Sequence, residues 1–182
     1  SLQDPVLVVL ADEPTASGDI FLRHKTSRRS RYDAAWQAAE ARGAFDALFF
    51  NERGELTEGG RSNVFVRMGD AWITPPLRCG VLPGVMRGVL LAAPAWHARE
   101  GVITRAMLDA ADDIVVCNAL RGPLRAVDRR YHGLQRGHDD VRVDPHPPQR
   151  ALADDALDVG RRACVAARAE GVLGVVQHRH LH

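Results

Sequence analysis

The middle of the sequence is a run of short β-type segments joined by tight turns, which limits the folds open to the chain. Four segments combine β-branched, aromatic and aliphatic residues, at positions 47–50, 55–57, 62–67 and 71–74. Asn-Glu-Arg-Gly at 51–54 separates the first two segments and Met-Gly-Asp at 68–70 separates the last two, and both have the chemistry of hairpin turns. Pro75 and Pro76 end the ribbon, because proline has no N–H to donate to a sheet. The sequence therefore predicts two consecutive β-hairpins.

Helical and strand patterns alternate around these hairpins. Aliphatic runs predict buried strands at 6–10 and 113–117, and residues 33–42, 84–93 and 104–111 have helical character. This mixture favours a single α+β (mixed α/β) architecture over an all-α or all-β one.

The overall composition excludes several classes of function. The 182 residues carry 24 Lys+Arg against 23 Asp+Glu, a net charge of +1, whereas dedicated nucleic-acid binders usually carry a basic excess. No apolar stretch is long enough to span a bilayer, so we expect no membrane partner. The three cysteines are widely spaced and form no Cys-x-x-Cys pair, which predicts reduced thiols in a cytoplasmic protein.

The texture of the sequence changes after about residue 127. Residues 128–182 hold six of the eight histidines and a Pro-rich stretch at 144–148, and only 151–170 has helical character. We therefore predict a main domain at 1–127 and an atypical extension at 128–182 with one helix. The histidines of the extension offer an alternative metal-binding hypothesis, but a terminal His-rich run is more often a solvated end, so no metal ligand is assigned. The histidines considered are His138, His146, His178, His180 and His182.

Only one of the 24 basic residues is a lysine, Lys25. A desolvated lysine can lose its proton and act as a base or an imine-forming nucleophile, which arginine cannot do. The competing interpretation is one leftover lysine on a solvated surface.

Four segments contain residue types suited to chemistry. Lys25 lies in the first, and Glu58 with two following glycines lies in the second. The third, 82–87, is a Pro-Gly start of a helix whose first N–H groups suit a phosphate. The fourth, 116–122, is a buried strand that ends in a polar turn. Each alone is more often a turn or a surface segment, but together they supply the amine, the acid and the anion site that pyridoxal phosphate needs.

The order of these segments resembles the larger, C-terminal domain of fold-type IV pyridoxal-phosphate enzymes. That family contains branched-chain aminotransferases, D-amino-acid aminotransferases and 4-amino-4-deoxychorismate lyases. The resemblance implies the pseudo-barrel of that domain. It covers His-Lys-Thr at 24–26, Asn-x-x-Gly-x-x-Thr-Glu-Gly at 51–59, Ser-Asn-Val-Phe at 62–65, Thr-Pro-Pro-Leu at 74–77, Leu-Pro-Gly-Val-Met-Arg at 82–87 and Ala-Asp-x-Ile-Val-Val-Cys-Asn-Ala-Leu-Arg-Gly at 111–122.

The resemblance also assigns roles position by position. Lys25 would bind the cofactor covalently as the Schiff-base lysine, and Glu58 would pair with its pyridine nitrogen. The remaining cofactor positions would surround the ring and the phosphate: Asn63, Gly84, Val85, Met86, Asn118 and Ala119.

Within the family, the segment after the lysine favours one activity. Branched-chain aminotransferases tend to have Asn-Tyr four and five residues after the lysine, where this chain has Arg29 and Ser30. The Lys-x-x-x-Arg spacing and the Cys-Asn-Ala-Leu sequence are similar to aminodeoxychorismate lyase, with Arg29 as a substrate contact. We thus expect a lyase of folate biosynthesis that releases pyruvate from 4-amino-4-deoxychorismate and leaves 4-aminobenzoate. The alternatives are a class IV aminotransferase of branched-chain or D-amino acids, and a non-catalytic truncated domain or His-rich metal-binding protein.

The resemblance carries expectations about partners as well. Family members have a smaller N-terminal domain with no counterpart here, so the chain resembles one domain of a longer product. We expect a small-molecule substrate, a homodimer, and fusion to or pairing with an aminodeoxychorismate synthase component.

Overall fold

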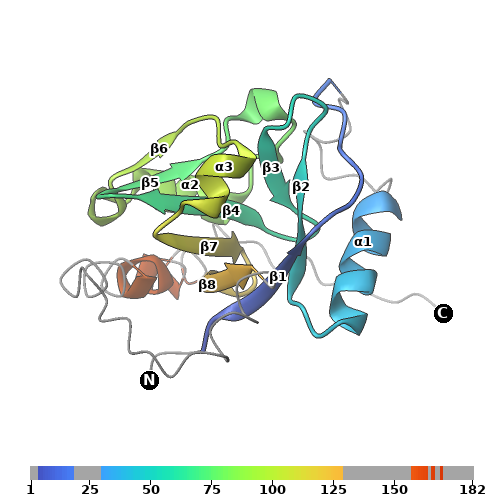
Figure 1. Ribbon diagram of the computed structural model, residues 1–182. Coiled ribbons are helices and arrows are strands. Elements are labelled where there is room, and N and C mark those ends of the chain that lie inside the picture. The colour runs from blue at the N-terminus through green and yellow to red at the C-terminus, as the bar shows by residue number, and fades with distance from the viewer. Residues whose placement is uncertain (1–3, 19–29, 129–156, 164, 167–168, 170–182) are drawn as a thin grey trace, which may run out of the picture.

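A single curled sheet organises the described part of the chain, which in this computed structural model comprises residues 4–18, 30–128, 157–163, 165–166 and 169. Within these ranges eight strands follow the order β3-β2-β1-β8-β7-β4-β5-β6 (Figure 1). The strands are β1 (Val6–Leu10), β2 (Asp46–Phe50), β3 (Leu56–Gly59), β4 (Asn63–Met68), β5 (Ala71–Thr74), β6 (Ala98–Glu100), β7 (Asp113–Asn118) and β8 (Gly122–Asp128). The helices are α1 (Ser30–Ala41), α2 (Val85–Ala92) and α3 (Arg105–Asp109), with short 3-10 turns η2 (Leu77–Cys79) and η3 (Pro94–Trp96).

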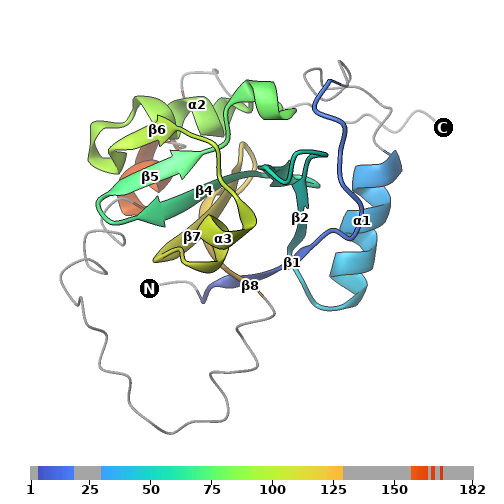
Figure 2. The same cartoon turned by 45° about the horizontal axis from the view of Figure 1, so that its top comes forward.

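The curl of the sheet brings its edge strand β3 against β4. Three hairpins, β2–β3, β4–β5 and β7–β8, are antiparallel, while β1 runs parallel to both β2 and β8. A short turn joins β3 directly to β4, and the Gly59 N–H donates to the Ser62 carbonyl at 2.7 Å. The result is the barrel-like sheet visible in Figure 2, which confirms the predicted α+β pseudo-barrel.

Alternate residues of the strands face different apolar clusters. On β4, Val64 and Val66 join the cluster on the α3 side of the sheet, whereas Phe65 joins the cluster packed under α2. Period-two alternation of side chains explains how one strand supplies both. On the β1–β2 side, Tyr32 of α1 packs on Phe49 with ring centroids 4.6 Å apart. Apolar residues are therefore buried on both faces of the curled sheet.

Most predicted elements are present. The two hairpins are confirmed by the cross-strand pairs Phe50↔Leu56 and Met68↔Ala71. Helix α1 begins at Ser30, three residues before the predicted start. Thr104 is the N-cap of α3 as predicted, and its Oγ1 accepts the Met107 N–H at 3.3 Å.

Two strands, β6 and β8, were not predicted. Strand β8 begins with Gly122 and Pro123, a typical turn signal, and carries a charged residue in its middle. That residue, Arg125, pairs with Asp113 of β7 at 2.8 Å, so a cross-strand ion pair accounts for the charge.

The helical segment near the C-terminus packs against α2. Its described residues 157–163 are helical and lie within the predicted helical range of 151–170. Leu157 belongs to the same buried cluster as Leu90 and Trp96. A Cβ added at Gly160 would lie 2.8 Å from Leu90 Cδ2, so the two helices approach closely.

Two further sequence expectations bear on this fold. Cys79 and Cys117 are reduced thiols, as predicted, and both are buried, while Cys164 lies outside the described residues. None of the described helices is long and apolar enough to cross a membrane.

Candidate functional site

The candidate site lies where β3 ends and β4 begins. Glu58 is next to last in β3, and Asn63 is the first residue of β4. Asn63 is also the register partner of Cys117, the residue before Asn118 in β7. The curl of the sheet therefore brings together three segments in which the sequence analysis placed cofactor contacts.

Glu58 and Asn63 both bind the backbone of Leu82, one at its N–H and the other at its carbonyl. The Glu58 side chain is buried, and its Oε2 accepts the Leu82 N–H at 2.9 Å. Asn63 donates through Nδ2 to the Leu82 carbonyl at 3.0 Å, and that nitrogen lies 3.4 Å from Glu58 Oε2. A buried carboxylate needs such donors, because an unpaired charge in the interior is costly. These contacts fix Glu58 relative to the segment that leads into α2.

The N-terminus of α2 lies against Asn63. Gly84 is the N-cap, and no side chain caps the helix. A Cβ at Gly84 would lie 2.0 Å from Asn63 Oδ1, so only glycine fits there without a shift. The first N–H groups of a helix lack intrahelical partners and carry partial positive charge, which suits an anion. Val85 is 46% exposed, while the Met86 side chain is buried in the core, so Met86 could contribute only its N–H.

Asn118 shapes the loop between β7 and β8. Its Oδ1 accepts the N–H groups of Leu120 at 3.1 Å and Arg121 at 2.8 Å, which closes a tight turn around Ala119. Its Nδ2 donates to the Arg61 carbonyl at 3.3 Å. The loop that holds Asn118 and Ala119 is thus tied to the turn between β3 and β4.

Sequence reasoning did not single out Asp46, although it contacts the same turn. Asp46 is fully buried at the start of β2, and its Oδ2 accepts the Ser62 hydroxyl at 2.5 Å. Burial raises the pKa of this carboxyl, and the hydrogen bond from Ser62 acts against that rise. The available signal was a charged residue between Phe45 and Ala47 in an otherwise apolar run.

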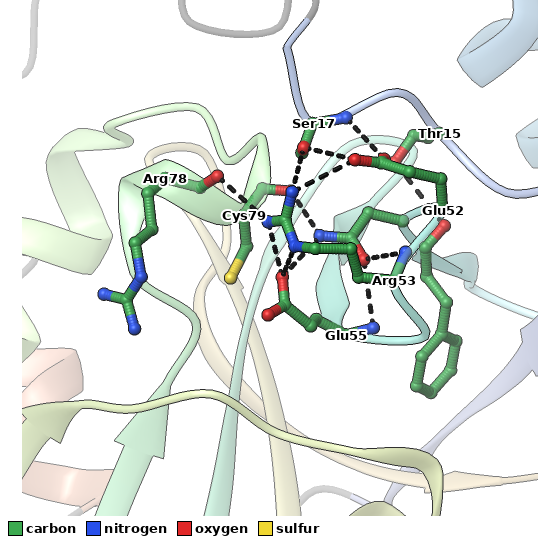
Figure 3. Close-up of polar contacts among 9 residues, drawn as sticks. Thr15, Ser17, Glu52, Arg53, Glu55, Arg78 and Cys79 are labelled. Carbon is green, nitrogen blue, oxygen red and sulfur yellow. Dashed lines mark hydrogen bonds and ion pairs between the residues drawn. The ribbon is translucent and has the colours of Figure 1, made fainter.

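Two of the predicted site residues, Lys25 and Arg29, lie outside the described residues. The nearest described segment before them is the loop that ends at Gly18. This loop is held to the β2–β3 hairpin by a polar cluster (Figure 3). Ser17 donates through its N–H and hydroxyl to the Glu52 carboxylate at 2.8 and 2.6 Å.

Arg53 stands at the centre of this polar cluster. Its guanidinium contacts Glu52 at 3.0 Å and Glu55 at 2.6 Å (Figure 3). Asn51 Nδ2 donates to Glu55 at 2.7 Å and to the Cys79 carbonyl at 3.2 Å. The cluster therefore ties the hairpin turn to the η2 segment. It contacts none of the described candidate cofactor residues.

A cavity of about 340 Å³ lies elsewhere, between β1 and α1. Its lining includes Val9, Phe49, Ala35 and Ala38, together with Arg42. No candidate site residue in the described part of the chain lines it. The cavity is therefore separate from the described candidate site.

The comparisons with known proteins identify the class to which this fold and site belong. A family model described as amino-transferase class IV matches residues 2–127, which is more than half of the chain. The chain belongs to the class IV aminotransferase family.

Individual relatives in this family carry two different provisional names. A protein of Schizosaccharomyces pombe, provisionally named aminodeoxychorismate lyase, is 30% identical over 99 residues, which is 54% of this chain and 41% of that protein. A Legionella pneumophila structure, provisionally named 4-amino-4-deoxychorismate lyase, is 27% identical with a TM-score of 0.65. The match covers 70% of this chain and 49% of the Legionella chain. A Mesorhizobium loti structure, provisionally named amino-acid aminotransferase, is 36% identical with a TM-score of 0.64. The match covers 70% of this chain and 61% of the Mesorhizobium chain.

A further structure shares the fold. It is a hypothetical aminotransferase of Mycobacterium tuberculosis in its PLP-bound form, 21% identical, with a TM-score of 0.67 and coverages of 90% and 56%. In each of these comparisons the chain spans less than two thirds of the other protein's length.

Proposed function

We propose that this chain binds pyridoxal 5′-phosphate and acts as a lyase that releases pyruvate from 4-amino-4-deoxychorismate to give 4-aminobenzoate. The observation that carries the cofactor proposal is the cluster of Glu58, Asn63 and the first residues of α2. It places a buried carboxylate within 2.9 Å of the peptide N–H of Leu82, two residues before an uncapped helix N-terminus. An acid and an anion site are the two fixed groups that a phosphorylated pyridine requires.

The residues present fit this cofactor. Gly84 leaves room beside Asn63 that a Cβ would fill, so the helix N-terminus and the amide can lie side by side. When bound, pyridoxal phosphate supplies an electron sink for reactions at the amine-bearing carbon of a substrate. In this proposal the N–H groups of Val85 and Met86 bind the phosphate, and Asn118 with Ala119 lines its other side.

The proton chemistry falls to two residues of this chain. Glu58 keeps a proton on the ring nitrogen, which its buried carboxylate can do because Leu82 already holds it in place. Lys25, the only lysine of the sequence, is the amine that binds the cofactor and moves the substrate proton. Loss of pyruvate makes the substrate ring aromatic, so the protein chiefly orients groups and transfers protons.

The lyase activity is supported by the two relatives that carry that name and by the Lys-x-x-x-Arg spacing of Lys25 and Arg29. The experiment is to incubate the chain with cofactor and 4-amino-4-deoxychorismate and to measure pyruvate and 4-aminobenzoate together. Equal amounts of both products support the proposal. A chain that binds the cofactor but releases neither product contradicts the lyase assignment.

A second candidate is an aminotransferase acting on branched-chain or D-amino acids. It is favoured by the relative from Mesorhizobium loti, whose identity of 36% exceeds that of both relatives named as lyases. The same cofactor site would serve, with the amino group passed to a 2-oxo acid. Glutamate formed from 2-oxoglutarate and an amino donor, without pyruvate release, would select this activity.

The remaining expectations concern the larger assembly. We propose that residues 1–127 form the larger domain of the enzyme, that residues 128–182 are an extension, and that the protein is a cytoplasmic homodimer. Pairing with or fusion to an aminodeoxychorismate synthase component belongs to the same proposal. Sedimentation of the chain with and without cofactor tests the dimer. The histidines considered for the metal alternative lie outside the described residues, and the described part of the chain holds no cluster of three or more metal-binding side chains.

A further inference from the structure

The turn between Glu58 and Asn63 is built around one buried carboxylate. Asp46 Oδ1 accepts the Ala47 N–H at 2.9 Å. Its Oδ2 accepts the Arg61 N–H at 3.2 Å and the Ser62 hydroxyl at 2.5 Å. All three partners are donors, and two of them belong to the four-residue turn that connects the proposed cofactor residues.

The two glycines of the turn leave the space that this carboxylate occupies. A Cβ on Gly59 would lie 2.3 Å from Asp46 Oδ2, which is closer than any real contact of that kind. A Cβ on Gly60 would lie 3.1 Å from Asp46 Oδ1 and 3.1 Å from the Tyr32 carbonyl. The paired glycines are therefore required by the closeness of Asp46 and α1, because neither glycine has a positive φ.

The other end of the turn is also tied down. Arg61 accepts a hydrogen bond from Asn118 at its carbonyl, and its guanidinium lies over the rings of Trp36 and Phe45 at 4.7 and 4.2 Å. The backbone of Arg61 thus has Asp46 on its N–H and Asn118 on its carbonyl. If the Asp46 carboxylate moved, the turn between β3 and β4 and the loop that holds Asn118 would therefore move with it.

We propose that Asp46 is the positioning residue of this site, because its buried carboxylate fixes the Gly59–Ser62 turn and so sets Glu58 relative to Asn63. The inference rests on the proposed function for the roles of Glu58 and Asn63. That Asp46 fixes the turn depends only on its hydrogen bonds with Ala47, Arg61 and Ser62.

The test substitutes Asp46→Asn. The variant keeps the shape of the side chain but points an NH₂ group at a donor, since both carboxylate oxygens already accept. We expect the Arg61 amide to exchange with solvent about 10-fold faster, the size typical for one lost hydrogen bond to a charged group. We expect the dissociation constant for pyridoxal phosphate to rise by about the same factor, and the visible absorbance maximum of the bound cofactor to shift.

Asp113→Asn is the matched control. Asp113 is also a carboxyl whose pKa is raised by burial, and its Oδ1 accepts the N–H of the next residue at 3.1 Å. It pairs in register with Arg67, at the end of β4 opposite Asn63. This variant should lose stability through its ion pair with Arg125 yet leave the Arg61 amide, the cofactor affinity and the spectrum unchanged.

The outcomes separate this inference from the proposed function. If Asp46→Asn and wild type share the same Arg61 exchange rate and the same cofactor affinity, the inference is overturned. If wild type binds no cofactor, the proposed function fails, while the exchange rate alone still decides whether Asp46 holds the turn. If Asp46→Asn does not fold, Ser62→Ala takes its place, because it removes one of the three contacts of Asp46. This variant should show the same changes in exchange rate and cofactor affinity at smaller size. If Ser62→Ala shows neither change, the inference is overturned.

Discussion

Glu58 is the residue on which the proposed chemistry depends most closely. Its carboxylate is buried and held by the Leu82 N–H, so replacement by the isosteric amide keeps the packing but removes the charge. For Glu58→Gln we expect pyruvate release to fall by about 100-fold, as when one group that stabilises developing charge is lost. Asp70→Asn, in the exposed β4–β5 turn, is the control and should keep full activity. Equal activity in both variants would exclude Glu58 from the chemistry.

Glu55 links stability to pH. Hydrogen bonds from Arg53 first and Asn51 second lower the pKa of Glu55 from its ordinary 4.5 to about 2. Because the folded pKa lies below the unfolded one, this contribution is present above about pH 4.5 and is lost as pH falls toward 2.

Urea unfolding at pH 6 and at pH 3 measures this effect. The midpoint should fall more for wild type than for Glu55→Gln, since all other carboxyls are common to both chains. An identical fall in the two proteins would show that the Arg53 network contributes nothing between these pH values.

The sequence indicated candidate residues of the site but not the contacts that hold them in place. Glu58 and Asn63 were proposed from the family resemblance, and the structure places Asn63 Nδ2 3.4 Å from Glu58 Oε2. Asp46 is 12 positions before Glu58 and reaches the turn because β2 and β3 pair. The sequence predicted that hairpin but began its first strand at residue 47, which left Asp46 outside it. In the sequence, the paired glycines at 59 and 60 were the one local sign that another group approaches this turn closely.

Among the elements, the N-terminus of α2 can be tested with two glycine substitutions. For Gly84→Ala we expect a loss of about 1–3 kcal/mol of unfolding free energy through overpacking against Asn63, together with weaker cofactor binding. Gly88→Ala in the same helix meets nothing within 4 Å and should raise stability by about 0.5–1 kcal/mol without changing cofactor affinity. If both variants bind the cofactor as wild type does, the helix start is not part of the site.

Elements with strong local signals were predicted well, and weak ones were missed. Strands β1 and β5 have the predicted bounds, because their residues are apolar and a turn or prolines delimit them. Strand β8 carries Gly122 and Pro123 at its start, and only its pairing with β1 and β7 makes it a strand. Strand β6 has three residues, too few for a periodic pattern to appear.

At the scale of the whole molecule, the described C-terminal helical segment shares its core with the sheet. Leu157 is 4% exposed in the cluster that contains Trp96 and Leu90. Leu157→Ala should therefore lower the unfolding free energy by about 2–4 kcal/mol. Val159→Ala, on the exposed side of the same segment, should change it by less than about 0.5 kcal/mol. Equal small effects would mean that this segment does not stabilise the pseudo-barrel.

The overall curl of the sheet was predicted through the family resemblance, because the strand order depends on contacts between distant segments. The hairpin pattern alone indicates neighbouring pairs such as β2–β3 and β4–β5. It contains no information on the parallel pairing of β1 with β8, whose partners are 120 positions apart (Val6 and Ala126).

The proposed binding of pyridoxal phosphate to Lys25, beside the Glu58 site, can be tested by covalent labelling. The chain is incubated with the cofactor, reduced with borohydride and mapped by peptide mass spectrometry. Because the sequence has a single lysine among its 24 basic residues, a side-chain adduct can form only at residue 25. We expect a visible absorbance band before reduction, a pyridoxyl group on the Lys25 peptide afterwards, and loss of both in Lys25→Arg. No adduct at that peptide, or a band that persists in Lys25→Arg, would contradict it.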